Sequence, residues 1–288
     1  MTTSPPIYVD LQSTQDRISN LRRYVEENLL REGEFICPHL NSCQTSIRPG
    51  DGFREGTMSH VGHRFDLRVG DKPLRVVVVG QESGLPKDTP ELAQKVTLDA
   101  RYGQVYHGSG MQSRYYAAGG HTPRNPHMRG TTSALRVLFG MGLGSDYDGE
   151  WIHPANGDPF HIFDGFALVN RLLCSAGPVG TSSGRPSKTM LTNCRDHFAE
   201  TLAILQPTIL IFQGDKATAN WPNDLKRGRT LRPGYPPLVE AHLGDQRIVV
   251  CEFSHPSAHG WQRWGANLDA HYLTNLLEPT LQEALQFS

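Results

Sequence analysis

The chain has 288 residues, five cysteines and a formal net charge of −1. This balance excludes a strongly basic protein that binds nucleic acid over its whole surface, but not a local basic groove. No apolar run reaches membrane-spanning length, and the first residues lack the charged and apolar regions of a signal peptide. We therefore expect a cytoplasmic protein without membrane association. In that compartment we expect no structural disulfides among its cysteines. Their odd number suggests a ligand set of four with one cysteine left over.

The first half of the chain predicts a helix, a buried strand and a long insert. Apolar residues at helical spacing predict an N-terminal helix over 13–31. Residues 48–72 are Gly-rich and charged, which favours a loop or a weak hairpin. The all-apolar, β-branched run at 75–79 predicts a strand that is covered on both faces. The irregular stretch at about 86–125 is rich in Tyr, Gly and His, and a loop of this length is usually functional.

The second half alternates between strands and helices. The further predicted elements are a helix at 131–141, a strand at 163–170, a helix at 193–205, a strand at 208–212, a helix at 215–221, a basic loop at 225–237, a strand at 247–253 and a helix or helix pair at 267–287. This order predicts an α/β fold with a parallel sheet wrapped by helices. No domain boundary is visible, so we expect a single domain over residues 1–288.

Polar residues follow three of the predicted strands. Gln81 and Glu82 follow the first strand, Asn170 ends the second, and His255 and Ser257 follow the last. Because parallel strands share one carboxyl edge, a carboxylate, an amide and an imidazole are expected at one rim, where such folds bind ligands. Each also has a simpler interpretation as a residue that favours a helix start, closes a turn or precedes a proline turn.

An ordered set of motifs accompanies these residues. GQESG occupies residues 80–84, HPS occupies 255–257, and LVNRLLC occupies 168–174. The segments NCRDHFAETLAILQPTILIFQGDKA and PHMRGTTSALRVLFGMGLG lie between the first and last motif. Together they resemble the uracil-DNA glycosylase superfamily, over a region that extends roughly from residue 37 to the C-terminus.

The resemblance implies a three-layer αβα fold with a central four-stranded parallel sheet. It also implies an enzyme that hydrolyses the N-glycosidic bond of a flipped-out pyrimidine and leaves an abasic site. His255 would hydrogen-bond the carbonyl oxygen of the leaving base, and Asn170 would read its Watson–Crick edge. The backbone around Gln81 would contact the base, and Glu82 would orient the attacking water. His127 falls near the aromatic residue that stacks on the base.

Three departures from the family pattern bear on the substrate. Glu82 stands where relatives place Asp or Asn, Ser83 replaces a proline, and the 86–125 insert is long. The insert suggests either a remodelled pocket or a solvated loop. We expect the base to be uracil or a hypermodified pyrimidine such as glucosylated hydroxymethylcytosine in phage DNA, in antiviral defence. The alternative function is a DNA-binding sensor of modified bases that does not cut and does not depend on Glu82.

The cysteines fit a metal centre found in one branch of this superfamily. That branch holds a [4Fe–4S] cluster with two early and two later cysteines. The corresponding residues here are Cys37, Cys43, Cys174 and Cys194. The first two are separated by five residues rather than two, and His39 lies between them, so a mixed Cys/His zinc site is the alternative. All four could also be buried apolar thiols, as we expect for Cys251.

Contacts to DNA require local charge because the chain is nearly neutral. Arg227 and Arg229 lie in the predicted basic loop and are candidates for phosphate contacts, although such a run is often a solvated face. Ser257 closes the HPS motif and is a further candidate for DNA contact. Trp261 belongs to the loop after this motif, which wedges into the duplex in the family. Core packing is the alternative for this tryptophan. We expect a monomer with DNA as its partner.

Overall fold

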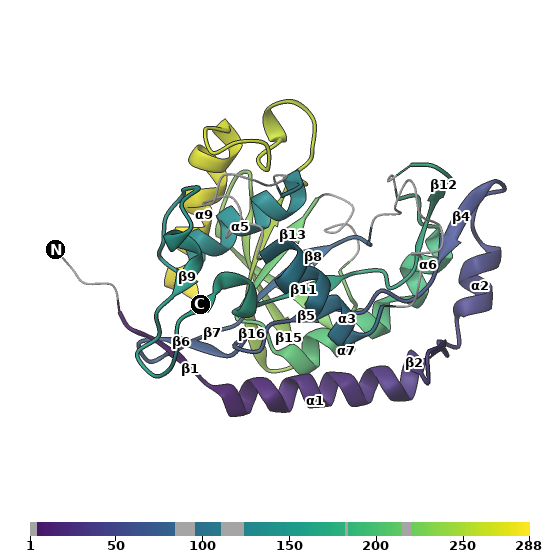
Figure 1. The fold of residues 1–288 in the computed structure, drawn as a ribbon. Coiled ribbons are helices and arrows are strands. Elements are labelled where there is room, and N and C mark those ends of the chain that lie inside the picture. Colours follow the sequence, from purple (N-terminus) through teal and green to yellow (C-terminus); the bar gives the residue numbers. More distant parts are fainter. Residues whose placement is uncertain (1–4, 84–95, 111–123, 182–183, 215–220) are drawn as a thin grey trace.

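The computed structural model describes residues 5–83, 96–110, 124–181, 184–214 and 221–288 (Figure 1). Most of the predicted insert at 86–125, and the predicted helix at 215–221 except for its last residue, lie outside the described residues. In the described part of the chain, no helix is both long and apolar enough to cross a membrane.

A seven-stranded mixed sheet organises the molecule, in the order β14-β15-β16-β13-β8-β11-β5. Its strands are β5 (His60–Val61), β8 (Val76–Gly80), β11 (Phe166–Asn170), β13 (Ile209–Gln213), β14 (Leu225–Arg232), β15 (Leu238–Leu243) and β16 (Gln246–Phe253). β8 pairs parallel with β11 and β13, and β13 pairs parallel with β16. The pairs β5–β11, β14–β15 and β15–β16 are antiparallel. The α/β class is therefore confirmed, but the sheet has more strands than the four predicted and is not purely parallel.

One predicted loop and the start of one predicted strand need correction. The basic loop predicted at 225–237 is wrong over Leu225–Arg232, because these residues form the edge strand β14. The predicted strand at 163–170 begins later, since Ile162–Asp164 form a 3-10 turn and the strand starts at Phe166. The strands predicted at 75–79, 208–212 and 247–253 each agree with the structure to within one residue.

Capping residues explain why two helices differ from their predicted bounds. α1 spans Leu11–Asn28 rather than 13–31, because the side chain of Asp10 accepts the backbone N–H of Ser13. α5 spans Pro126–Leu138 rather than 131–141. Asn125 caps it by accepting the N–H of Met128, and proline suits the first helical position because its missing N–H has no helical partner.

The remaining elements surround the sheet. The helices are α2 (Leu40–Thr45), α3 (Leu98–Tyr102), η2 (Gly103–Gly110), η3 (Asp148–Glu150), η4 (Ile162–Asp164), α6 (Lys188–Asn193), α7 (Arg195–Leu205), η5 (Gly260–Gln262), η6 (Leu273–Leu277) and α9 (Glu278–Phe287). The small strands are β1 (Ile7–Val9), β2 (Leu30–Arg31), β3 (Glu34–Phe35), β4 (Asp51–Arg54), β6 (Leu67–Val69), β7 (Lys72–Leu74), β9 (Trp151–Ile152), β10 (Phe160–His161) and β12 (Ser175–Pro178). The predicted C-terminal helix pair corresponds to η6 and α9.

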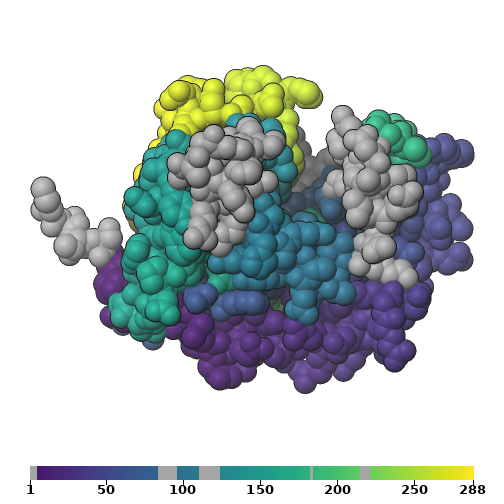
Figure 2. Space-filling view, in the orientation of Figure 1, coloured from purple at the N-terminus to yellow at the C-terminus, as the bar shows by residue number. Residues whose placement is uncertain are grey.

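Alternate residues of β8 enter two separate apolar cores. Val76 and Val78 pack in a cluster with Leu135 of α5 and with residues of α9. Val77 and Val79 pack in a second cluster with residues of α1 and α7, such as Leu202. Successive side chains of a strand point to opposite faces, so an all-apolar strand is expected where helices cover both faces (Figure 1). In the view of Figure 2, α1 forms the lower border of the molecule and the C-terminal segment its upper border.

Candidate functional site

Two of the predicted site elements meet where β8 and β11 end. Asn170 is the register partner of Gly80, and the backbone N–H of Arg171 donates to the carbonyl of Gly80. A Cβ at Gly80 would lie 3.3 Å from Oδ1 of Asn170, so the buried amide lies directly against the glycine. Glycine at this position lets the amide lie close to the backbone that leads into GQESG.

Glu82 is held between the end of β8 and the loop that precedes α6. Nε2 of Gln81 donates to Oε1 of Glu82 at 2.9 Å. A Cβ built on Gly184 would lie 1.4 Å from the same carboxylate oxygen. Gly184 therefore has no room for a side chain, and the loop lies against the carboxylate. Gly184 is a neighbour of Glu82 that sequence reasoning missed.

His255 is a hydrogen-bond donor in its neutral form. Its Nδ1 accepts the backbone N–H of Ser257 at 3.1 Å, which leaves the proton of the neutral ring on Nε2. Desolvation lowers the pKa of His255, so the neutral form is favoured further. A Cβ at Gly214, whose φ is +103°, would lie 3.3 Å from Cβ of His255. The end of β13 thus lies directly beneath this histidine.

The imidazole rings of His127 and His255 are stacked. Their ring centroids are 5.4 Å apart and their planes differ by 25°. Desolvation, followed by the nearby His255 and Arg101, lowers the pKa of His127 to about 3, so this ring is also neutral near pH 7. The structure therefore places these two predicted residues side by side. Arg101, from α3, was not singled out from the sequence, because it lies inside the irregular insert.

The backbone before His255 is fixed by the segment that follows it. Tyr272 Oη accepts the N–H of Ser254 at 2.9 Å, and Nε1 of Trp264 donates to its carbonyl at 2.7 Å. Trp264 is buried and belongs to the core, whereas Trp261 is 59% exposed and its ring contacts the ring of Tyr235 edge-on. Of the two tryptophans, Trp261 is the one accessible from outside, and its predicted role as a wedge stays a prediction.

The two arginines predicted to bind phosphates lie in ion pairs. Arg227 is 2.8 Å from Glu252 and stacks over the ring of Trp221, with its guanidinium carbon 5.0 Å from the ring centroid. Arg229 is 3.4 Å from Glu240. Both arginines remain half exposed or more, so these pairs are partly solvated and weak. Their contact with DNA stays a prediction, and the glutamates reduce the local positive charge.

Four thiols gather between the end of β11 and the helices α2, α6 and α7. Burial, with smaller contributions from Cys43 and Cys37, raises the pKa of Cys194 to about 11. Burial also raises the pKa of Cys174, to which all three other thiols contribute. Hydrogen bonds from backbone N–H groups lower the pKa of both thiols. The N–H of Gly56 acts on Cys174, and the N–H groups of Leu173 and Cys174 act on Cys194. The two early and two later cysteines are thus close enough to influence the pKa of one another, and Cys251 is buried elsewhere, in β16.

Zinc and an iron–sulfur cluster require different arrangements of their ligands. Within the residues that the structure describes, no three His, Cys, Asp or Glu side chains are grouped to hold one ion. A zinc ion needs its ligands within about 2.3 Å of a single point. A cluster is larger than one ion, so its thiolates stand further apart and are stabilised by backbone N–H groups. Cys174 and Cys194 have backbone N–H donors of the kind that a cluster uses, and His39 is exposed at the start of α2.

A histidine that sequence reasoning missed contacts this group of thiols. His197, on α7, has Nε2 3.5 Å from Sγ of Cys37 and Nδ1 2.6 Å from the hydroxyl of Tyr24. It follows Cys194 by three residues, which places both on one side of the helix start. That spacing was the only signal in the sequence.

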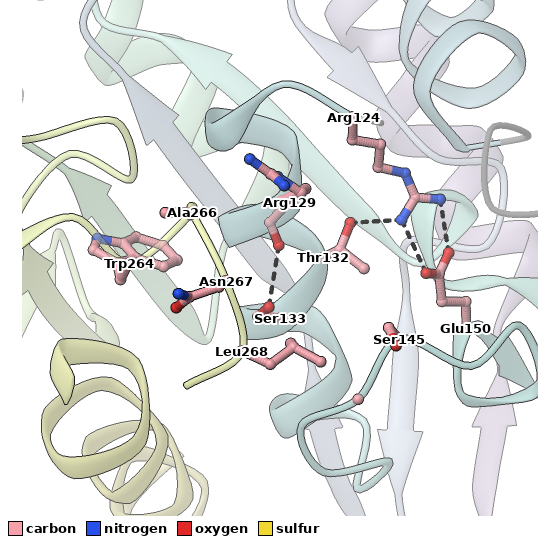
Figure 3. A pocket seen from close by; sticks show the side chains of 12 residues that line it. Arg124, Arg129, Thr132, Ser133, Ser145, Glu150, Trp264, Ala266, Asn267 and Leu268 are labelled. Carbon is pink, nitrogen blue, oxygen red and sulfur yellow. Dashed lines mark hydrogen bonds and ion pairs between the residues drawn. The ribbon is translucent and has the colours of Figure 1, made fainter. Parts of the chain in front are cut away.

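A cavity of about 210 Å³ lies beside α5, away from these residues (Figure 3). It is bounded by α5, by the loop with Gly144 and Ser145, and by Trp264–Leu268. Its main charged groups bind each other: Arg124 holds Glu150 at 2.7 Å and also donates to Thr132. None of the residues predicted for the site lines the cavity. We therefore keep the candidate site at the strand ends, where Asn170 ends its strand and Glu82 and His255 follow theirs.

Glu150 links this arginine to a buried histidine. Nε2 of His161 is 2.9 Å from Oε2 of Glu150, and Nδ1 of His161 accepts the N–H of Phe163. Burial alone would raise the pKa of Glu150, but hydrogen bonds from His161 and Arg124 outweigh it and bring the pKa to about 2. This carboxylate is therefore charged at neutral pH although it is buried.

Neither a model of a known protein family nor a curated protein sequence matches this chain.

Proposed function

We propose that this protein is a monofunctional DNA glycosylase, a monomer of the cytoplasm, that hydrolyses the N-glycosidic bond of a flipped-out pyrimidine. The base is uracil or a hypermodified pyrimidine, and the product is an abasic site. The observation that carries the proposal is the Nε2–H donor of His255, which the N–H of Ser257 orients and which lies at the strand ends. A donor at this place can stabilise negative charge on a departing base.

The other residues of the site supply the rest of the reaction. Asn170, held against Gly80, offers a fixed amide to the edge of the base. Glu82 offers a carboxylate that orients water and favours the cationic sugar. Because His255 is neutral, it donates a hydrogen bond without placing a full positive charge beside that sugar. Two neutral imidazoles and one carboxylate suit a reaction in which the base leaves as an anion.

A three-layer αβα fold with a four-stranded parallel centre is part of this proposal. The adjacent strands β16, β13, β8 and β11 and their parallel pairing support it. The antiparallel strands at both ends of the sheet are additions to that pattern.

We propose that Cys37, Cys43, Cys174 and Cys194 hold a [4Fe–4S] cluster, with zinc as the alternative. Their mutual proximity and the N–H donors to their sulfurs support this assignment. When bound, the cluster would act as a structural link between the N-terminal segment and the end of β11. The positive charge of the buried Arg171, next to Cys194, would offset part of the negative charge of the thiolates.

Replacing Cys174 with serine is expected to remove the broad visible absorption of the purified protein and most of its bound iron. A ligand is lost from the cluster, and the thiolates that remain do not complete it. Absorption spectra and metal analysis measure the effect, and Cys251→Ala serves as the control because Cys251 is buried elsewhere. A wild-type protein that contains zinc and has no visible band would contradict the cluster and support zinc.

The function is tested by base release from DNA strands that carry uracil, 5-hydroxymethylcytosine, glucosylated 5-hydroxymethylcytosine or only ordinary bases. The proposal expects one modified strand to lose its base and to break at the abasic site after alkaline treatment. Chromatography of the released base identifies the substrate. Tight binding to one modified strand with no release would instead support the alternative function, a sensor of modified bases.

Gly184→Ala is expected to lower kcat by about 10²-fold, because the new Cβ displaces the carboxylate of Glu82 and a shift of about 1 Å has this cost. The melting temperature should change little, since the loop is partly exposed. Gly103→Ala is the matched control: a Cβ there meets no atom within 4 Å. An unchanged kcat in Gly184→Ala would show that the position of Glu82 does not matter for the reaction.

A further inference from the structure

Gln213 is a buried polar residue at the end of an otherwise apolar strand. It is the last residue of β13, is 1% exposed, and precedes Gly214, which lies beneath His255. Apolar side chains would suffice to fill this place in the core. A buried amide at the strand ends therefore calls for an explanation from hydrogen bonding.

The hydrogen-bond network fixes which way the amide of Gln213 points. The hydroxyl of Thr131 donates its only proton to the carbonyl of His127 at 3.0 Å. This hydroxyl can therefore only accept from Gln213, and the 3.1 Å contact must be made by Nε2. Oε1 is forced to the opposite side. An amide flip would oppose two acceptors or leave the Thr131 oxygen without its donor.

The oxygen of this amide is buried and has no hydrogen-bond partner among the described residues. His127 is the neighbouring imidazole, because its carbonyl accepts from the same Thr131 hydroxyl that accepts from Gln213. The side chain of Gln213 is also among the influences on the pKa of His127. His127 and Thr131 are four residues apart in the first turns of α5, so both lie on the same side of this helix. Oε1 needs an N–H, and the ring of His127 can supply one.

His127 can serve as this donor only in one of its two neutral forms. Its pKa of about 3 keeps it neutral near pH 7, and its place in the first turn of α5 disfavours a positive charge. A neutral imidazole has one N–H and one bare nitrogen. If the N–H points to Gln213, the other nitrogen is an acceptor.

We propose that Gln213 is a positioning residue that holds His127 in a single tautomer by accepting its N–H at Oε1. His127 is then an acceptor beside the Nε2–H donor of His255. The stacked pair presents one donor and one acceptor, which matches a base edge that offers a carbonyl oxygen next to an N–H or O–H group. The identity of the ligand as a base rests on the proposed function, whereas the tautomer does not.

The first test is nitrogen NMR of the full-length protein labelled at histidine, with His127→Asn used to assign the signals. Wild type should show two widely separated ring nitrogens for His127 at neutral pH. Gln213→Leu removes the acceptor and Thr131→Val frees the amide to flip, so both should bring the two shifts together. Thr131→Ser keeps the hydroxyl and should retain the wild-type separation. Unchanged shifts in both Gln213→Leu and Thr131→Val would overturn the proposal.

The second test measures base release by the same variants. The preferred base is compared with an analogue in which the N–H of the same edge is methylated. Wild type should prefer the unmethylated base at least 10-fold in kcat/KM, and Gln213→Leu should lose most of this preference. Shifts that depend on Gln213 without release from any base would refute the glycosylase and leave the tautomer lock standing. Base release together with nitrogen shifts of His127 that do not change in Gln213→Leu would support the glycosylase and refute the role of Gln213.

Discussion

Glu82→Gln is expected to slow base release by about 10²–10⁴-fold, the usual contribution of a general acid or base. Glutamine keeps the size of the side chain and can still contact Gln81, but it cannot carry the negative charge that activates water. Single-turnover release at saturating enzyme measures the chemical step alone. Glu200→Gln is the matched control, since Glu200 is an exposed carboxylate of α7.

The affinity for substrate DNA distinguishes a catalytic role of Glu82 from a structural one. Removing a carboxylate from a site that receives polyanionic DNA should leave binding unchanged or make it tighter. Weakened binding together with a lower melting temperature would indicate that Glu82 mainly holds the loop at Gly184. A Glu82→Gln protein as fast as wild type would remove Glu82 from the reaction.

Arg124→Met is expected to destabilise the protein by about 3–5 kcal/mol, because it leaves the buried carboxylate of Glu150 without its charged partner. His161 would keep its hydrogen bond to that carboxylate but cannot replace two guanidinium contacts (Figure 3). Urea unfolding followed by circular dichroism measures the loss.

The double variant Arg124→Met/Glu150→Met separates the cost of an unpaired charge from the loss of packing. It removes both charges, so it should be less destabilised than Arg124→Met alone. Equal losses in the single and double variants would mean that packing over Phe163, whose ring centroid lies 4.9 Å from the guanidinium carbon, dominates instead.

The elements that could be predicted are those whose apolar sequence indicates that they are buried. β8 and β13 are runs of apolar residues without polar interruptions, and such runs are typical of strands covered on both faces. β5 has two residues and leaves no pattern, and β14 carries an arginine-rich sequence that resembles a loop. β14 is a strand because it pairs with β15, a long-range contact that no local pattern encodes.

Some residues of the candidate site could likewise be predicted from the sequence, and others could not. Asn170 and His255 could be found because parallel strands bring their ends to one edge, so a polar residue after each strand is a spatial signal. Gln213 stands at the same edge but closes an apolar run, and nothing in the sequence shows that its amide is buried rather than solvated. Arg101 influences His127, and His197 contacts Cys37, through packing of helices that depends on contacts far apart along the chain.

The arginines of β14 have a second consequence, for the sheet as a whole. β14 is an edge strand of the described sheet, and an edge strand exposes backbone groups to which any extended segment of another molecule can add. Lys226, Arg227 and Arg229 are exposed on this strand, and a second copy of it would bring like charges together even though the two arginines are paired with glutamates. The opposite edge, β5, is only two residues long. Charged side chains on an edge strand disfavour edge-to-edge pairing, whether or not these side chains touch DNA.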